Sequence, residues 1–149
     1  MSESTANSWV GTTNGRPTIG AESTRSKSIT AADVERFAAI TGDRNPLHFD
    51  EEFAGNSVFG QLIVPGGLTS GILNAIVAQD LPGPGTVFLS VEWRFVKAVQ
   101  IGETIVGSVR VTSVRDDKPI CLIETLVRNE VGEDCLTGTA ATYTASPQR

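Results

Sequence analysis

The segment from about Gly67 to Gln79 carries apolar or small side chains on nearly every face of a helix. Its apolar positions are Leu68, Ile72, Leu73, Ala75, Ile76, Val77 and Ala78. A helix that is apolar all round is stable only when other parts of the protein surround it. The Pro-Gly turn at residues 81–85 ends the helix. The rest of the chain must therefore supply a layer around it, and the small residues Gly71, Ala75 and Ala78 would let that layer approach the helix backbone closely.

After this turn the apolar period changes from that of a helix to the alternation of a β-strand. The apolar residues Val87, Leu89, Val91, Trp93 and Phe95 alternate with polar ones. Further strands are expected at about residues 105–112, 119–128 and 135–144. The connections between these strands are short, which predicts antiparallel neighbours. We therefore expect an α+β fold, in which a mainly antiparallel sheet of five or six strands wraps around the central helix.

The first third of the chain predicts a strand from about Glu22 to Ile29 and a helix from about Ala31 to Thr41. Thr30 and Asp33 have the spacing of a capping box at the start of this helix, and Gly42 is a natural stop. Residues 1–17 are rich in Ser, Thr, Asn and Gly, so we expect a flexible N-terminal tail, with Trp9 and Val10 able to pin part of it. Residues 18–149 are expected to form a single domain.

Composition excludes several classes of function. A net charge of −5 argues against nucleic-acid binding, which depends on a basic surface. No stretch reaches the roughly 18 consecutive apolar residues that a membrane-spanning helix needs. The chain begins without a basic segment followed by an apolar one, so the expected location is the cytoplasm. With one histidine and two separated cysteines, Cys121 and Cys135, neither a metal site nor a disulfide framework is expected.

The one histidine, His48, follows Asp43 by five residues. Pro46 stiffens the segment between them and holds Asn45 in an extended conformation, and the Asn45 side chain is able to brace the backbone. A stiff segment can aim an acid and an imidazole at one point with little loss of entropy on binding. The spacing alone does not choose between a catalytic pair and a structural turn.

The stretch from Phe37 to His48, followed by Ala54, resembles the hydratase-2 signature of MaoC-like enoyl-CoA hydratases. Residues 62–68 resemble the segment that leads into the central helix of that family, and residues 91–103 resemble its first long strand and the following turn. The resemblance covers roughly residues 19–144. It implies a hot-dog fold and a homodimer, with tunnels for the acyl chain near the interface between the subunits.

The resemblance also implies a reaction. Asp43 and His48 would activate a water molecule and add it, in the syn sense, to a trans-2-enoyl-CoA, which gives the (R)-3-hydroxyacyl-CoA. Our working assignment makes Asp43 the principal base and His48 the proton donor, although such a pair titrates as one unit. The backbone N–H of Gly66 would stabilise the enolate oxygen, since a helix N-terminus presents unpaired N–H groups and partial positive charge. No cofactor is implied.

The substrate-binding residues that we expect are Asn45, Pro65, Gly67, Ser70 and Asn74. Pro65 and Gly67 depart from the residues usual in the family, and so does Ala98. The space left open by Gly67 would admit a branched or bulky acyl group. Ser70 and Asn74 either line a pocket or satisfy local backbone groups.

Four cations lie either on solvated strand surface or against the CoA phosphates: Arg94, Lys97, Arg115 and Lys118.

Three other functions are compatible with the same fold. A 3-hydroxyacyl-ACP dehydratase would run the reaction in the opposite direction on a carrier protein, but the acidic chain offers little basic surface for docking. A hot-dog thioesterase would direct water at the carbonyl carbon instead. A non-catalytic acyl-CoA-binding subunit would have no reason to retain both Asp43 and His48.

Overall fold

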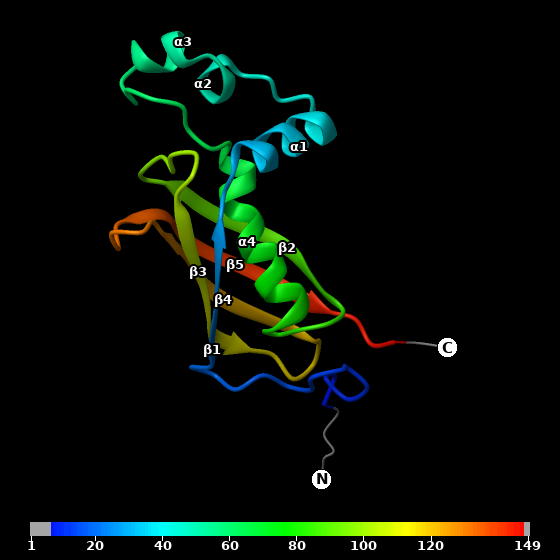
Figure 1. The fold of residues 1–149 in the computed structure, drawn as a ribbon. Helices are drawn as coiled ribbons and strands as arrows, with labels where there is room; N and C mark the ends of the chain where they lie inside the picture. The colour runs from blue at the N-terminus through cyan, green and yellow to red at the C-terminus, as the bar shows by residue number, and fades with distance from the viewer. Residues whose placement is uncertain (1–6, 148–149) are drawn as a thin grey trace.

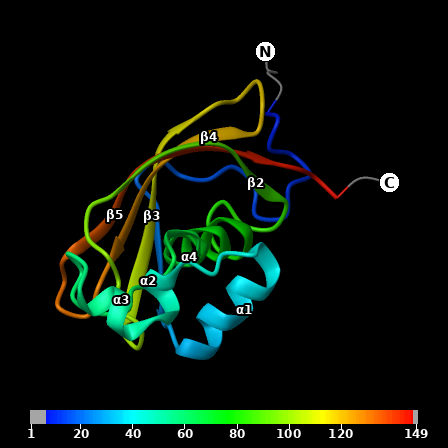
Figure 2. The ribbon, with the colours of Figure 1, turned by 90° about the horizontal axis from the view of Figure 1, so that it is seen from above.

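The computed structural model describes residues 7–147. One five-stranded antiparallel sheet curves around a single long helix, α4, as Figures 1 and 2 show. The strand order is β1-β3-β4-β5-β2, so β1 and β2 form the two edges. In chain order the elements are β1 (Glu22–Ser28), α1 (Ala31–Thr41), α2 (Pro46–Phe49), α3 (Glu51–Gly55), α4 (Gly66–Gln79), β2 (Thr86–Phe95), β3 (Thr104–Val114), β4 (Ile120–Arg128) and β5 (Asp134–Thr144). The predicted α+β architecture is confirmed.

The core lies between α4 and the concave face of the sheet. Leu73 and Ile76 are fully buried there, and Gly107 of β3 lets Ile72 approach the strand closely, since a Cβ on Gly107 would lie 2.7 Å from Ile72 Cγ2. The expected close approach at the small residues of α4 is wrong at Gly71, where a Cβ would meet nothing within 4 Å. The small residue that allows close packing therefore lies on the sheet, because the helix presents its large side chains to it.

Strand β2 changes face halfway along its length, which the alternation pattern did not predict. The register with β5 shifts between Phe88 and Ser90. Phe88 and Trp93 are five residues apart, yet both pack on the core, and their rings meet edge to face at 5.6 Å. On a regular strand an odd spacing would place them on opposite faces. The extra residue of the bulge reverses the alternation, so Val87 is 55% exposed instead of facing the core.

The prediction that consecutive strands are neighbours is wrong for β2 and β3, which lie at different places in the sheet. The connection at residues 96–103 crosses the end of the fold where α4 begins. Its backbone pairs with the segment that leads into α4, because Val64 donates its N–H to Val99 at 2.7 Å and Ile63 bridges to Gln100. The hairpins β3–β4 and β4–β5 follow the prediction.

The N-terminal segment packs against the opposite end of the fold. Trp9 belongs to the core and donates its indole N–H to the Arg115 carbonyl at 2.6 Å, while Val10 is 76% exposed. The core therefore includes a residue N-terminal to the predicted domain boundary at residue 18. Residues 1–6 of the expected tail lie outside the described residues, and its flexibility stays a prediction. Between residues 7 and 147 no helix has the length and apolarity needed to span a bilayer.

Candidate active site

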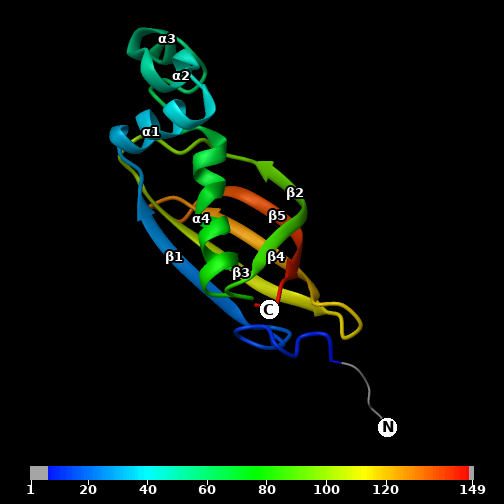
Figure 3. The ribbon, with the colours of Figure 1, turned by 90° about the vertical axis from the view of Figure 1, so that its right-hand side faces the viewer.

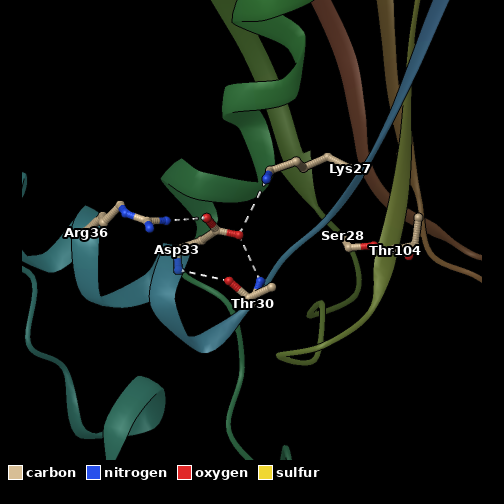
Figure 4. Close-up of polar contacts among 6 residues, drawn as sticks. All are labelled: Lys27, Ser28, Thr30, Asp33, Arg36 and Thr104. Atoms are coloured by element: carbon tan, nitrogen blue, oxygen red, sulfur yellow. Dashed lines mark hydrogen bonds and ion pairs between the residues drawn. The ribbon is translucent and has the colours of Figure 1, made fainter.

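Helix α1 is held at its start by the predicted capping box, which Figure 4 shows. Thr30 Oγ1 accepts the Asp33 N–H at 3.2 Å, and the Asp33 carboxylate accepts the Thr30 N–H at 2.9 Å. Lys27 and Arg36 also approach this carboxylate, at 3.6 and 3.2 Å. The hydrogen bond from the Thr30 backbone is the main cause that holds the pKa of Asp33 below its ordinary value. The capping box sets where α1 begins, and therefore where its C-terminal end delivers the chain.

The end of α1 positions Asp43. Gly42, at φ +83°, closes the helix by donating its N–H to Ala38 at 2.8 Å. Thr41 Oγ1 donates to the Phe37 carbonyl at 2.7 Å and accepts the Asp43 N–H at 3.1 Å. The Asn45 N–H then binds Asp43 Oδ1 at 3.2 Å. One carboxylate oxygen of Asp43 is thus tied to the backbone, and Oδ2 faces the imidazole.

His48 lies on α2, one of two short helices that we did not predict. Asn45 is the N-cap of α2, accepting the Leu47 N–H at 3.0 Å, and Pro46 occupies the first helical turn. Asp50 caps α3 by accepting two backbone N–H groups. An N-cap residue followed by proline at the first helical position was a sequence signal for α2. In this structure the side chain of Asn45 serves as a cap, and its expected contact with substrate stays a prediction.

The tautomer of neutral His48 follows from its surroundings. Nδ1 lies 2.7 Å from the Ile63 carbonyl oxygen, and a carbonyl only accepts, so Nδ1 carries a proton. The lone pair of neutral His48 is then on Nε2, which lies 3.7 Å from Asp43 Oδ2. The His48 side chain is 7% exposed and that of Asp43 is 38% exposed, so solvent reaches the pair from the Asp43 side.

The distance between the two side chains suits a shared water molecule. A separation of 3.7 Å is too long for a direct hydrogen bond. One water oxygen placed beside the pair can lie about 2.8 Å from both atoms. Such a water would donate one proton to Asp43 Oδ2 and would also bind Nε2, as donor when His48 is neutral and as acceptor when His48 is the imidazolium. In either state one of its lone pairs stays free. The geometry therefore meets the main demand of the predicted chemistry, that both groups act on one water molecule.

The N-terminus of α4 borders a cavity of about 670 Å³. Pro65 is the N-cap and provides no side-chain hydrogen bond to the first turn, so the first N–H groups of the helix are available to a ligand. Gly66 lines the cavity, and the ring of Phe95 lies against Gly66. Thr69, which we did not predict, also lines it and is buried. Ile63 lines it as well, and its carbonyl connects the cavity wall to His48, although neither His48 nor Asp43 lines the cavity itself.

The other expected substrate-binding residues, Gly67, Ser70 and Asn74, all lie on α4 but differ in their surroundings. A Cβ on Gly67 would lie 2.7 Å from Phe37 Cζ, so the expected open space beside Gly67 is wrong, because a phenyl ring fills it. Ser70 is buried and donates to the Gly67 carbonyl at 3.1 Å, which satisfies a local backbone group. Asn74 is exposed one turn further along α4. The substrate contacts of these residues stay predictions.

Three of the four candidate cations lie at the two ends of the molecule, and Arg94 is exposed on β2. Arg115 pairs with Asp117 through two hydrogen bonds, of 2.9 and 2.6 Å, on the β3–β4 turn, and Lys118 lies on the same turn. Lys97 lines the cavity, 3.8 Å from the Glu133 carboxylate. In the part of the chain that the structure describes, no group of three or more potential metal ligands occurs.

An antiparallel sheet wrapped around one long helix defines the hot-dog class of proteins. The chain belongs to the MaoC-like family, whose MaoC like domain model matches residues 14–132. The chain is similar to an (R)-specific enoyl-CoA hydratase of Aeromonas caviae, with 36% identity over 82% of this chain and 91% of the relative. A protein of the same name from Rhodospirillum rubrum is 32% identical over 71% and 74%. The solved structure of an A. caviae (R)-hydratase superposes with a TM-score of 0.82 at 34% identity, covering 87% of this chain and 98% of that one.

Proposed function

We propose that the protein is a lyase that catalyses the reversible syn hydration of trans-2-enoyl-CoA to (R)-3-hydroxyacyl-CoA. The observation that carries the proposal is the separation of 3.7 Å between Asp43 Oδ2 and His48 Nε2. Two groups that exchange protons near neutral pH are what the addition of water requires. The names of the A. caviae and R. rubrum relatives support the same reaction and the same class of substrate.

The proposed reaction keeps one proton on the Asp43–His48 pair. In the hydration direction, the pair begins with this proton on His48 Nε2. Asp43 accepts a proton from the water as its oxygen bonds to C3, and His48 donates its proton to C2. Asp43 then carries the proton and His48 is neutral, so one proton transfer from Asp43 to His48 restores the pair. This sequence keeps the working assignment of base and donor, and it requires His48 to start as the imidazolium.

The Gly66 N–H is proposed to stabilise the negative charge that develops on the thioester oxygen. Gly66 lines the cavity at a helix start that lacks a side-chain cap, which supports this role. A single donor of this kind typically contributes about 3–4 kcal/mol to transition-state stabilisation. The enolate would thus form between the acid–base pair and the start of α4, since His48 is bonded to the carbonyl of Ile63, three residues before Gly66.

The oligomeric state, the metabolic role and the location of the enzyme are also proposals. We infer a homodimer, because the edge strand β2 leaves Val87, Leu89 and Val91 55%, 54% and 43% exposed, and a long apolar edge needs a cover. A role in fatty-acid metabolism follows from the proposed substrate. The proposed location is the cytoplasm, with which the two cysteines agree, because both are buried and neither forms a disulfide.

One assay tests the proposal against its alternatives. Crotonyl-CoA and longer trans-2-enoyl-CoAs are mixed with the protein while the absorbance of the conjugated thioester and free CoA are followed together. We expect the absorbance to fall without release of CoA, and the product to be the (R) isomer by chiral analysis. Release of CoA would indicate a thioesterase. No change at any chain length, with binding retained, would indicate a non-catalytic subunit. Turnover of an enoyl-ACP but not of the enoyl-CoA would assign the protein to the carrier-protein dehydratases.

A further inference from the structure

The ring of Phe37 packs directly onto the backbone of Gly67. A Cβ built on Gly67 would lie 2.7 Å from Phe37 Cζ and 3.2 Å from Cε1, so the ring occupies the place where any other residue would carry its side chain. Phe37 is on α1, and Gly67 is the second residue of α4. The contact therefore joins the helix that precedes Asp43 to the helix that supplies the proposed N–H of Gly66.

Phe37 is linked to Asp43 by two consecutive hydrogen bonds. The Phe37 carbonyl accepts from Thr41 Oγ1 at 2.7 Å, and the same Oγ1 accepts the Asp43 N–H at 3.1 Å. His48 is linked to the start of α4 by a different path, through the Ile63 carbonyl at 2.7 Å. Asp43 thus has its own connection to α4, and it passes through Phe37.

The contact between Phe37 and Gly67 matters for the position of α1, because few other side chains of this helix are buried. Only Val34 and Ala38 of α1 are fully buried, and Phe37 is half-buried. In Figure 3, α1 to α3 lie beyond the N-terminal end of α4, away from most of the sheet. A helix with so few buried side chains depends on each of them for its position. A movement of α1 would carry Gly42 and Asp43 with it, since they follow its last residue directly.

We propose that Phe37, seated on Gly67, is a positioning residue that sets the distance between Asp43 and the start of α4. The inference rests on the proposed hydratase function and deepens it. Gly67 is then required for the approach of α1, and it is not a source of space for the acyl chain. Misplacement of a reacting group by about 1 Å can reduce a rate by about a hundredfold. A small shift of α1 is therefore sufficient to lower kcat while the fold and substrate binding persist.

The first test compares two glycines of the same helix. Gly67→Ala adds a methyl group where Phe37 lies, whereas Gly71→Ala adds one where nothing lies within 4 Å. We expect Gly67→Ala to lower kcat for crotonyl-CoA about tenfold or more with KM nearly unchanged. Gly71→Ala should retain the wild-type kcat and KM. Equal kcat values for the two variants and the wild type would overturn the inference.

The second test asks whether Phe37 mediates the effect. In Gly67→Ala/Phe37→Leu, the smaller side chain leaves room for the new methyl group, so most of the lost kcat should return. Phe37→Ala, which removes the contact, should lower kcat on its own. If kcat of the double variant falls by the product of the factors lost in Gly67→Ala and in Phe37→Leu alone, the two residues act independently and the proposal is contradicted. If Gly67→Ala does not fold, Phe37→Ala decides the matter, because a merely structural role would lower its melting temperature and leave the kcat of the folded enzyme unchanged.

The third test separates positioning from contact with substrate. A positioning effect should lower kcat by the same factor for four-carbon and eight-carbon enoyl-CoAs, because it acts on Asp43. A loss that depends on chain length would mean that Gly67 lines the acyl site, and it would overturn the inference. The proposed function is judged separately by the wild type. A wild-type protein that hydrates no enoyl-CoA refutes the function, whereas an active wild type with an equally active Gly67→Ala refutes only the role of Phe37.

Discussion

The two ends of α4 are built in opposite ways. At its N-terminal end, Pro65 gives the first turn no side-chain cap, and Gly66 faces a cavity. At its C-terminal end, Asp80 and Leu81 both donate their N–H groups to the Ile76 carbonyl, at 2.8 and 2.9 Å. Gly83 donates to Val77 at 3.0 Å, so a second carbonyl of the last turn is also satisfied.

This difference separates stability from function along one helix. At the C-terminal end the backbone groups are paired and the N-terminal segment packs nearby, so that end contributes to the free energy of unfolding. At the N-terminal end unpaired N–H groups remain available to a ligand, close to the Asp43–His48 pair. Substitutions at the N-terminal end of α4 should therefore change kinetics with little effect on stability. Substitutions at the C-terminal end should lower stability with little effect on kinetics.

The largest expected effect is at the catalytic end. Asp43→Asn and His48→Ala should each lower kcat about 10²–10⁴-fold, the range that general acid–base catalysis contributes. The melting temperature should stay close to that of the wild type for Asp43→Asn, since the asparagine oxygen can still accept the Asn45 N–H. Asp116→Asn, on the exposed β3–β4 turn, is the control and should keep full activity. Near-normal turnover of either site variant would refute the pair.

The next effect is expected at the opposite end, from Trp9. Trp9→Ala removes a buried side chain and should lower the free energy of unfolding by about 3–5 kcal/mol, as measured by denaturant titration. The kcat of the folded variant should equal that of the wild type. Val10→Ala, next to it but 76% exposed, is the matched control and should be nearly neutral. A variant of Trp9 as stable as that of Val10 would mean that the N-terminal segment does not contribute to the core.

A smaller effect is expected from Asp80, the C-cap of α4. Arg25 binds this carboxylate at 2.7 and 3.1 Å, and the hydrogen bond is the main cause that lowers the pKa of Asp80. A lowered carboxyl pKa stabilises the fold above the ordinary pKa and ceases to do so as the pH falls through the lowered value. Asp80→Asn should therefore cost about 0.5–1 kcal/mol at about pH 7 and clearly less at about pH 2. A constant difference between these two pH values would exclude the ion pair as the cause.

The smallest effect is expected from Lys97 in the cavity wall. Because Glu133 partly neutralises it and half of its side chain is exposed, its attraction for a CoA phosphate should be modest. Lys97→Gln should raise KM for crotonyl-CoA up to about fivefold, which corresponds to a surface ion pair of about 1 kcal/mol. KM for the N-acetylcysteamine thioester, which has no phosphate, should not change. Lys118→Gln, at the other end of the molecule, is the control, and an equal effect from it would show that the charge acts non-specifically.

The sequence by itself determined the elements that depend on local contacts. The bounds of α1, its Thr30–Asp33 capping box and its stop at Gly42 followed from residues within four positions of one another. The predicted bounds of α4 were correct except that the helix starts one residue earlier, at Gly66. This agreement was possible because a run of apolar residues closed by a Pro-Gly turn defines a helix without reference to its neighbours. The spacing of Asp43 and His48 was likewise readable, together with the stiffness that Pro46 gives to the segment between them.

Only the tertiary structure decided how these elements meet. The bulge in β2 depends on its pairing with β5, and the ring of Phe37 fills the space at Gly67, although thirty residues separate the two. The proton on Nδ1 of neutral His48 follows from the carbonyl of Ile63, which no local pattern places there. Each of these features is a contact between distant parts of the chain, and local periodicity contains no information about which distant residue will complete a contact.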